Sequence, residues 1–438
     1  MFLFEGTSIN KKQIKALIAT EEDSHTLDTP SESIVVPPNY TDEEMSAYSK
    51  SNHINVQNAP VDCINSFFEL LDDDKEKSYI SKIAQTYSKP TPIQSCAVSY
   101  ILQQRDTLCI APTGSGKTLV YVLGGILQLM RKNNLNSSTT KMLIVVPTKE
   151  LMIQIKSYIQ KYFEITVGMI DKLHKYKQPI LVSTPLLLVR AIDNKQVTLD
   201  LDVFVMDEAD KLLNKQFIKD IQHIHKNLKT KQVIMTSATF PHDLELIAKM
   251  MMHDAIRVTV GNRGANVNID QKLVYCGNTQ GKLLEMKNMI LEGIKPPILI
   301  FVNDVDSGRK LFRELKNEIV KLGILHAFLT PQQRKQVMSK FIAGDIWVLI
   351  TSDVLSRGID MDIEMVINYD APVDSKTYIH RIGRTGRQRK GYAITFYTNY
   401  DIDSMKKIVN VMKETGMTIP AHLLQVQHNK KRKTINKE

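Results

Sequence analysis

The sequence predicts an α/β protein with two tandem parallel-sheet domains joined by a short linker. From about residue 62, short apolar runs alternate with segments of helical length, which is typical of βαβ units. A Gly/Asn-rich break at residues 261–268 divides the runs into two series. The first series comprises residues 107–111, 142–147, 180–183, 202–206 and 232–236. The second comprises residues 298–302, 324–327, 346–350, 365–369 and 392–397.

These patterns predict four parts of the chain. Residues 1–61 form a polar, partly disordered extension, because they include Pro30, Pro37 and Pro38 and show little periodicity. Residues 62–262 and 263–420 form the two α/β domains, and residues 421–438 form a basic tail. In residues 1–60, nine acidic residues and four lysines give a charge of −5. The basic surface therefore belongs to the domains.

Composition narrows the class of protein. The net charge of +10 and the pI of about 9.1 favour a polyanionic partner. The four scattered cysteines predict a reducing compartment, without a disulfide framework or a zinc site. No apolar run approaches the roughly 20 residues that span a bilayer, and the leader is acidic and free of arginine. We therefore expect a soluble intracellular protein.

A phosphate-binding loop is expected between the apolar strand at 107–110 and the helix that follows. Its backbone N–H groups and the helix N-terminus would cradle phosphate oxygens. Lys117 would reach the β- and γ-phosphates, and the Thr118 hydroxyl would bind Mg²⁺. A chance Gly-rich turn would not also fall between a strand and a helix. The loop residues are Ala111, Pro112, Thr113, Gly114, Ser115, Gly116, Lys117 and Thr118.

An acidic group follows the apolar run at 202–206. Asp207 and Glu208 would lie beside the phosphate loop, because ligands bind at the carboxyl ends of parallel strands. Asp207 would hold Mg²⁺ through water, and Glu208 would orient or deprotonate the attacking water. An acidic helix start is the plain alternative, but the position about 90 residues after the loop argues against it.

With both signatures present, residues 62–420 resemble the DEAD-box RNA helicases, which implies two RecA-like P-loop domains. Tyr87 to Gln94 is similar to the adenine-reading Q motif, with Gln94 on the base edge and Pro92 within the motif. Either Phe67 or Phe68 would stack on the ring. An amide suits adenine because it donates and accepts hydrogen bonds in one plane.

The resemblance also assigns roles to residues of the later motifs. Ser237, Thr239, Asp210 and His380 would couple hydrolysis to strand separation. In the second domain, Gly358 and Asp360 would contact the nucleotide, with Asp360 on the ribose. Arg384 and Arg387 resemble arginine fingers, whose planar donors match a γ-phosphate in transfer. Alone, that stretch would also suit a basic RNA-contacting helix.

Residues that would bind the RNA backbone follow from the same resemblance. They are Pro147, Thr148, Lys149, Thr184, Pro185, Asn303, Arg334 and Ser352. Several positions depart from the family: Lys149 replaces arginine, Leu186-Leu187 replaces Gly-Arg, Pro331 replaces glutamine, and Gly168-Met169 replaces a glycine doublet. These changes affect RNA-contact elements only. We expect normal ATP hydrolysis with a weaker or differently shaped grip on RNA.

Finer sequence details are similar to the nucleolar Rok (rescuer of kem) branch, which acts on pre-rRNA in small-subunit ribosome biogenesis. The resemblance implies an ATP- and Mg²⁺-dependent RNA helicase that is monomeric, nucleolar and assisted by assembly factors. The basic segment 430–433 suits nuclear import or a solvated terminus. The alternatives are an ATP-dependent RNA clamp, a DEAD-box helicase acting in another process such as splicing, and a DNA-translocating motor.

Overall fold

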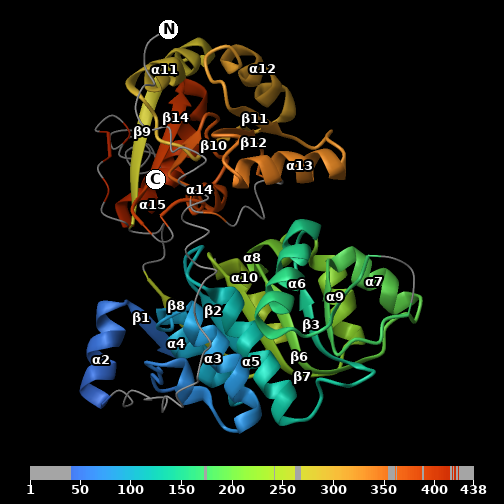
Figure 1. Ribbon diagram of the computed structural model, residues 1–438. Helices are drawn as coiled ribbons and strands as arrows, with labels where there is room; N and C mark the ends of the chain where they lie inside the picture. Colours follow the sequence, from blue (N-terminus) through green and yellow to red (C-terminus); the bar gives the residue numbers. More distant parts are fainter. Residues whose placement is uncertain are drawn as a thin grey trace, which may run out of the picture. The chain divides into compact units, whose positions relative to one another are not determined.

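The computed structural model describes residues 41–171, 175–240, 242–261, 268–353, 361, 363–386, 389–414, 417, 419–420 and 423. These residues build two separate parallel sheets, which confirms the predicted tandem α/β architecture (Figure 1). The first sheet ends at Val260 and the second begins at Ile269. Among the helices of the described ranges, none is both long and apolar enough to cross a membrane.

The first sheet contains eight strands within the described residues. Their order across the sheet is β1 (Ile54–Gln57), β8 (Ile256–Val260), β2 (Thr107–Ile110), β7 (Thr230–Ser237), β6 (Leu199–Asp207), β3 (Thr140–Val145), β5 (Ile180–Ser183) and β4 (Val167–Met169). Neighbouring strands pair in parallel, except that the edge strand β1 runs antiparallel to β8. The central strands are buried on both faces, as expected for a parallel sheet covered by helices.

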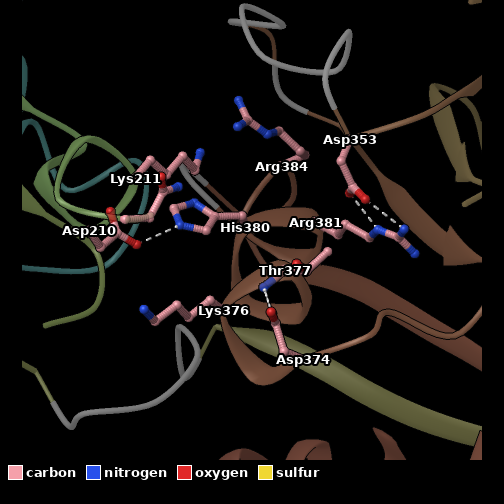
Figure 2. A pocket seen from close by; sticks show the side chains of 10 residues that line it. Asp210, Lys211, Asp353, Asp374, Lys376, Thr377, His380, Arg381 and Arg384 are labelled. Carbon is pink, nitrogen blue, oxygen red and sulfur yellow. Dashed lines mark hydrogen bonds and ion pairs between the residues drawn. The ribbon is translucent and has the colours of Figure 1, made fainter. Parts of the chain in front are cut away.

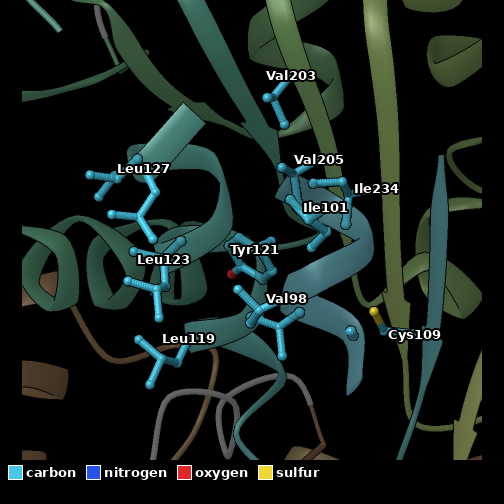
Figure 3. Packing of buried hydrophobic residues seen from close by; sticks show 14 of the residues in the cluster. Val98, Ile101, Cys109, Leu119, Tyr121, Leu123, Leu127, Val203, Val205 and Ile234 are labelled. Carbon is cyan, nitrogen blue, oxygen red and sulfur yellow. The ribbon is translucent and has the colours of Figure 1, made fainter. Parts of the chain in front are cut away.

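Alternate strand residues separate two layers of core. Cys109 packs on one face, whereas Leu108 and Ile110 pack on the other. The first face is covered by α3 (Asp74–Thr86), α4 (Pro92–Leu102), α5 (Lys117–Arg131) and α6 (Lys149–Phe163). The second is covered by α7 (Pro185–Asp193), α8 (Ala209–Leu212), α9 (Ile218–Asn227) and α10 (His242–Met251). Figure 3 shows Ile101 of α4 next to the strand residues Val205 and Ile234, which belong to the same core cluster.

The second sheet has six parallel strands within the described residues. Their order is β11 (Leu322–Leu325), β12 (Val348–Thr351), β10 (Ile298–Phe301), β13 (Met365–Asn368), β14 (Gly391–Thr398) and β9 (Ile269–Gly277). One face packs against α11 (Thr279–Glu292) and α12 (Val305–Leu315). The other packs against α13 (Pro331–Ile342), α14 (Ser375–Ile382) and α15 (Ile402–Glu414). The short 3₁₀ turn η2 (Asn399–Asp401) precedes α15.

Ordered structure begins before residue 62. Residues assigned to the N-terminal extension form α2 (Asp42–Ser51) and β1. The α2 helix is stabilised at its start by a reciprocal capping box between Thr41 and Glu44. Ile54 of β1 is buried because its side chain packs into the first core layer, and β1 pairs with β8 along the whole strand. A four-residue strand in a polar context carries too weak a pattern to be recognised from sequence.

The expectation that the cysteines form no disulfide is wrong for one pair. The structure joins Cys63 to Cys96, and both side chains are buried. The segment around Ile64 lies along the start of α4, because Ile64 N–H donates to the Ser95 carbonyl at 3.0 Å. The two cysteines are 33 positions apart, so their spacing in the sequence gives no sign that they meet.

Candidate functional site

The predicted ATP residues and the predicted RNA residues occupy different parts of the carboxyl edge of the first sheet. The phosphate loop follows β2, Ser237 ends β7 and Asp207 ends β6, and these three strands are neighbours. Thr148 follows β3 and Thr184 follows β5, which are the next two strands in the sheet. The strand order therefore places the predicted ATP residues side by side and the predicted RNA residues beside them.

The phosphate loop has the backbone that its glycines predict. Gly114 and Gly116 adopt left-handed φ angles of +79° and +87°, a region that glycine enters without steric cost. A Cβ at Gly116 would collide with the Gln94 amide. The Ser115 hydroxyl is buried and has no hydrogen-bond partner within the described structure. The loop thus presents an unpaired polar atom where phosphate oxygens are expected.

Lys117 begins α5 and folds back over the phosphate loop. Its ammonium donates to the carbonyls of Ala111 at 2.6 Å and Pro112 at 2.8 Å. Loss of water around the ammonium lowers the pKa of Lys117 to about 8, although the carboxylates of Asp207 and Asp210 act in the opposite direction. A phosphate at this position would favour the charged form of the lysine and raise its pKa again.

Gln94 connects the Q-motif segment to the phosphate loop. Its side-chain oxygen accepts from Thr91 N–H at 2.9 Å, and its amide nitrogen donates to the Gly116 carbonyl at 3.1 Å. Thr91 also donates through its hydroxyl to the Ser115 carbonyl at 2.7 Å. A glutamine amide has two donor hydrogens, so one remains for a base. Pro92 opens α4, the helix that carries Gln94.

The aromatic residues near the Q motif differ in burial. Phe67 and Phe68 lie in the 3₁₀ turn η1 (Phe67–Leu70), where Phe67 is only 1% exposed within the core. Phe68 is half-buried, so of the two phenylalanines it alone has a substantial ring surface left for stacking. Tyr87 ends α3 and packs its ring 6.1 Å from that of Tyr162.

Asp207 is buried and held by three donors. Its Oδ1 accepts from Thr236 Oγ1 at 2.5 Å and from Glu208 N–H at 2.9 Å, and its Oδ2 accepts from Tyr121 Oη at 2.9 Å. Burial raises the pKa of Asp207 despite these donors. Sequence reasoning missed Tyr121 and Thr236. A signal did exist for Tyr121, which lies four positions after Lys117 and hence on the same face of α5.

The next acidic residues have separate partners. Glu208 adopts a left-handed conformation with φ +54°, and its Oε2 accepts from Lys211 Nζ at 2.7 Å. Asp210 Oδ2 accepts from Thr239 Oγ1 at 2.8 Å and lies 3.2 Å from His380 Nε2. Although burial acts to raise it, the His380 and Thr239 contacts hold the pKa of Asp210 well below its usual value.

Residues from both sheets line one pocket. Figure 2 shows Asp210 of α8 in contact with His380 of α14, and Lys211 and Arg384 line the same pocket. Arg384 is 8% exposed. A second contact joins the phosphate loop to the turn after α14, where Thr113 Oγ1 donates to the Gly383 carbonyl at 3.2 Å. A Cβ at Gly383 would collide with the Thr113 hydroxyl, so this approach requires glycine.

The predicted RNA residues of the first sheet occupy helix starts. Thr148 caps α6 by accepting from Leu151 N–H at 3.3 Å, and Lys149 follows as an exposed residue. Thr184 precedes α7 without capping it through its side chain, and Pro185 is the first residue of that helix. Pro147 is buried before α6. Helix starts present free N–H groups, which suit phosphate oxygens.

In the second sheet, Asn303 and Ser352 follow β10 and β12, which are neighbours. Asn303 Oδ1 accepts from Arg381, a buried residue that also pairs with both Asp353 carboxylate oxygens, at 2.6 and 2.8 Å. Arg334 of α13 donates to two carbonyls of the loop that precedes this helix. Sequence reasoning gave Arg381 no role, and the structure shows that it ties the strand ends of this sheet together.

Three predicted nucleotide residues, Gly358, Asp360 and Arg387, lie outside the described residues. The residues that are described fit a nucleoside triphosphate, because a left-handed glycine loop, a lysine and an unpaired buried hydroxyl meet after β2. They also fit Mg²⁺, since Thr118 and Asp207 offer only hard oxygen donors. Magnesium is commonly held by one or two carboxylates together with substrate phosphates.

Comparison with protein families gives two matches. The family described as DEAD/DEAH box helicase matches residues 91–247, and the helicase conserved C-terminal domain matches residues 281–389. The chain is 36% identical to the ATP-dependent RNA helicase ROK1 of Eremothecium gossypii, covering 92% of this chain and 76% of that protein. It is 38% identical to ROK1 of Kluyveromyces lactis, covering 80% and 65% of the two proteins.

Two solved helicase structures share the fold of this chain. Saccharomyces cerevisiae Dbp5 bound to RNA and ADP BeF3 superposes with a TM-score of 0.71 at 28% identity, covering 81% of this chain and 94% of that one. Mss116p bound to single-stranded RNA and AMP-PNP gives a TM-score of 0.72 at 23% identity, covering 83% and 80%. The second likeness supports the fold alone.

Proposed function

This chain belongs to the DEAD-box family of ATP-dependent RNA helicases, and on that premise we propose that it hydrolyses ATP between its two domains while holding RNA across both. The observation that carries this proposal is that the two domains touch at the predicted ATP residues. Thr113 of the phosphate loop contacts Gly383, and Asp210 contacts His380. Residues of both domains thus surround one candidate reaction site.

Each residue has a role that its surroundings support. The phosphate loop and Lys117 bind and neutralise phosphate, and Gln94 reads the base while bracing Gly116. Asp207, oriented by Tyr121 and Thr236, would hold the metal together with Thr118. Bound Mg²⁺ supplies charge neutralisation and orientation of the phosphates. Glu208 positions or deprotonates the attacking water.

Arg384 supplies positive charge from the second domain. Its partly desolvated guanidinium lines the same pocket as Asp210 and His380. In the transition state, negative charge is spread over the oxygens of the transferred phosphoryl group, and arginine donors in related enzymes contribute about 10³–10⁵-fold in rate. Hydrolysis therefore depends on contact between the two domains. The contact between Asp210 and His380, which Thr239 supports by donating to Asp210, forms only when the domains touch. Arg387, Gly358 and Asp360 join this site in the proposal.

RNA lies along the carboxyl edges of both sheets, at Pro147–Lys149 and Thr184–Pro185 in the first and at Asn303, Arg334 and Ser352 in the second. Contacts to phosphates and 2′-hydroxyl groups explain binding without sequence selection. The net charge of +10 supports a polyanionic ligand. Binding that bends one strand away from A-form geometry would melt a short duplex locally.

The RNA substrate that we propose is pre-rRNA, and the process is small-subunit ribosome biogenesis in the nucleolus, with assembly factors as partners. Support comes from the sequence features shared with the Rok branch and from the relatives named ROK1. Mapping ultraviolet crosslinks from the protein to cellular RNA tests this assignment. Crosslinks concentrated on pre-mRNA instead would favour the splicing alternative.

An RNA clamp with little unwinding is the second candidate. It is favoured by Leu186-Leu187, where a phosphate-binding Gly-Arg is usual, and by Arg334, whose guanidinium is engaged by its own loop. Strand displacement of a short duplex with a single-stranded tail separates the candidates. ATP-dependent displacement supports the helicase, whereas ATP-dependent binding without displacement supports the clamp.

The proposed site is tested by ATP hydrolysis with and without RNA. We expect RNA to stimulate hydrolysis, and we expect Gly383→Ala to abolish the stimulation while ATP binding survives, since the added Cβ collides with Thr113. Gly344→Asn is the control, because no atom lies near the Cβ position of that second-domain glycine and asparagine tolerates its left-handed φ of +78°. Undetectable hydrolysis with every RNA tried would refute the ATPase proposal.

A further inference from the structure

An exposed aromatic ring lies in the loop between β11 and α13. Phe328 is 71% exposed, which is unusual for a phenylalanine on an ordered loop. Its loop follows the carboxyl end of β11, the same edge of the second sheet that carries Asn303 and Ser352. The ring therefore lies on the side of the domain that carries the proposed RNA residues.

The backbone around Phe328 is fixed from both sides. Arg334 donates through Nη2 to the Ala327 carbonyl at 2.6 Å and through Nε to the Leu329 carbonyl at 3.0 Å. Thr330 then begins α13 with a reciprocal capping box to Gln333. A ring on a fixed loop loses little conformational entropy when it binds a ligand. Arg334 is thus a positioning residue for Phe328.

Positive charge surrounds the ring. The guanidinium carbon of Arg309 lies 5.2 Å from the Phe328 ring centroid, within the range of a cation–π contact. Burial, together with the nearby charges of Arg309 and Arg334, lowers the pKa of His326. The His326 ring approaches Phe328 edge-on at 6.3 Å. An exposed ring with arginines around it matches the surfaces on which single-stranded bases stack.

The loop also adjoins the first domain's proposed RNA contact. Arg334 Nη1 lies 4.0 Å from Glu150 Oε1, and Glu150 follows the exposed Lys149. We propose that Phe328 stacks on an unpaired RNA base at the junction of the two domains, with Arg309 supporting the ring. This inference rests on the proposed RNA-binding function and adds a base contact to a surface otherwise described by phosphate contacts.

Charge decides between RNA and an apolar protein partner as the occupant. Two arginines lie around the ring, and the one acidic group described in contact with them, Glu150, is only at the 4.0 Å limit of Arg334. An apolar partner would leave these guanidinium groups poorly solvated. A nucleotide can contact both the exposed ring and the arginines, because its base stacks on the ring and its phosphate faces the guanidinium groups.

The test uses tryptophan as a reporter in the full chain. Trp347 is the only tryptophan, so Trp347→Phe removes the intrinsic tryptophan fluorescence. Phe328→Trp in that variant then places a single indole on the loop. We expect its fluorescence to be quenched by an oligouridylate in the presence of an ATP analogue, and not by an abasic oligoribonucleotide of equal length. Val320→Trp in the same background is the matched control, because Val320 is 99% exposed and precedes β11 at its other end.

Affinity gives an independent readout through fluorescence anisotropy of labelled RNA. Phe328→Ala should weaken binding of the base-bearing RNA roughly 5- to 150-fold, the equivalent of losing about 1–3 kcal/mol of stacking. Binding of the abasic RNA should change less than about twofold, and Phe328→Tyr should restore wild-type affinity.

Two outcomes would overturn the stacking proposal. One is equal weakening of both RNAs by Phe328→Ala, which would indicate a damaged loop. The other is unchanged affinity for both while the wild-type protein binds them well, which would show that no base stacks on Phe328. Failure of the wild-type protein to bind any RNA would refute the proposed function itself, and that result is read from the unmutated chain.

Discussion

His380 Nε2 lies 3.2 Å from Asp210 Oδ2, and the two residues belong to helices of different domains, α14 and α8. Both side chains are largely buried, with 12% and 1% exposure. The contact ends a chain that runs from Ser237 through Thr239 to Asp210 and across to the second domain. Movement of either domain would therefore alter the environment of the carboxylate beside the candidate catalytic residues.

We expect His380→Ala and Asp210→Asn each to lower the rate of RNA-stimulated hydrolysis. The double variant should hydrolyse ATP no more slowly than the less active of the two single variants. Residues that act through one contact give non-additive effects, here about 1.5–3 kcal/mol for a hydrogen bond to a charged group. A double-mutant cycle on kcat measures the coupling. The exposed pair His223 and Asp193, 2.9 Å apart within the first domain, is the control, and equal coupling in both cycles would contradict the assigned role.

The pH dependence of ATP binding should follow the protonation state of Lys117. The pKa of Lys117 is lowered to about 8 in the fold, below its ordinary 10.5, so the free protein gains stability as the pH rises between these values. A bound phosphate favours the charged lysine. ATP binding therefore takes up a proton above about pH 8, and the affinity should fall by up to about tenfold per pH unit.

Titration of a fluorescent ATP analogue from pH 6.5 to about pH 9.5 measures this effect. Lys117→Arg is the matched control, because a guanidinium stays charged throughout the range and its weaker binding should not vary with pH. A wild-type affinity that is flat to the end of the range would show that Lys117 keeps its proton in the free protein.

Glu208→Gln and Lys117→Ala should both abolish turnover, for different reasons. The glutamine keeps the volume of the side chain but cannot deprotonate water, so hydrolysis should fall by about 10²–10⁴-fold while ATP and RNA stay bound. The lysine variant should lose ATP affinity, because the phosphate charge is no longer balanced. Filter binding with labelled ATP and RNA separates the two. An equal loss of ATP affinity in both variants would contradict this division of roles.

Much of the fold could be predicted because buried parallel strands are continuous apolar runs. The runs at 180–183 and 298–302 correspond to β5 and β10. The short strand β1 was missed, since an edge strand buries only part of its surface and needs no such run. The Cys63–Cys96 bond was missed because pairing depends on which segments meet in space.

The candidate site was predicted only where a short motif carries the chemistry. The phosphate loop and the Asp207–Asp210 stretch are contiguous in the sequence, and the structure gathers them at the ends of β2 and β6. Tyr121 and Arg381 contact residues that are distant in the sequence. Tyr121 donates a hydrogen bond to Asp207, and Arg381 donates to Asp353. Their side chains are common in any protein, so their roles become visible only once the partners are placed.

Arg381 should stabilise the second sheet through the shape of its guanidinium. It is 1% exposed and donates to Asp353 twice, to the Asp370 carbonyl and to Asn303. Lysine keeps the charge but cannot make four directed contacts, so Arg381→Lys should cost roughly 2–3 kcal/mol, less than a fully buried pair because Asp353 is partly exposed. The opening free energy of amides in β10 and β13, measured by hydrogen exchange, reports this loss.

The control for that prediction is Arg389→Lys. Arg389 pairs with Glu364 at 3.0 Å in the same domain, but its side chain is 58% exposed. Solvent screens an exposed pair, so we expect a change within about 0.5 kcal/mol. Equal protection of β10 and β13 in the two variants would mean that the strand ends are held by their own packing, and Arg381 would then have no special part in presenting Asn303 to RNA.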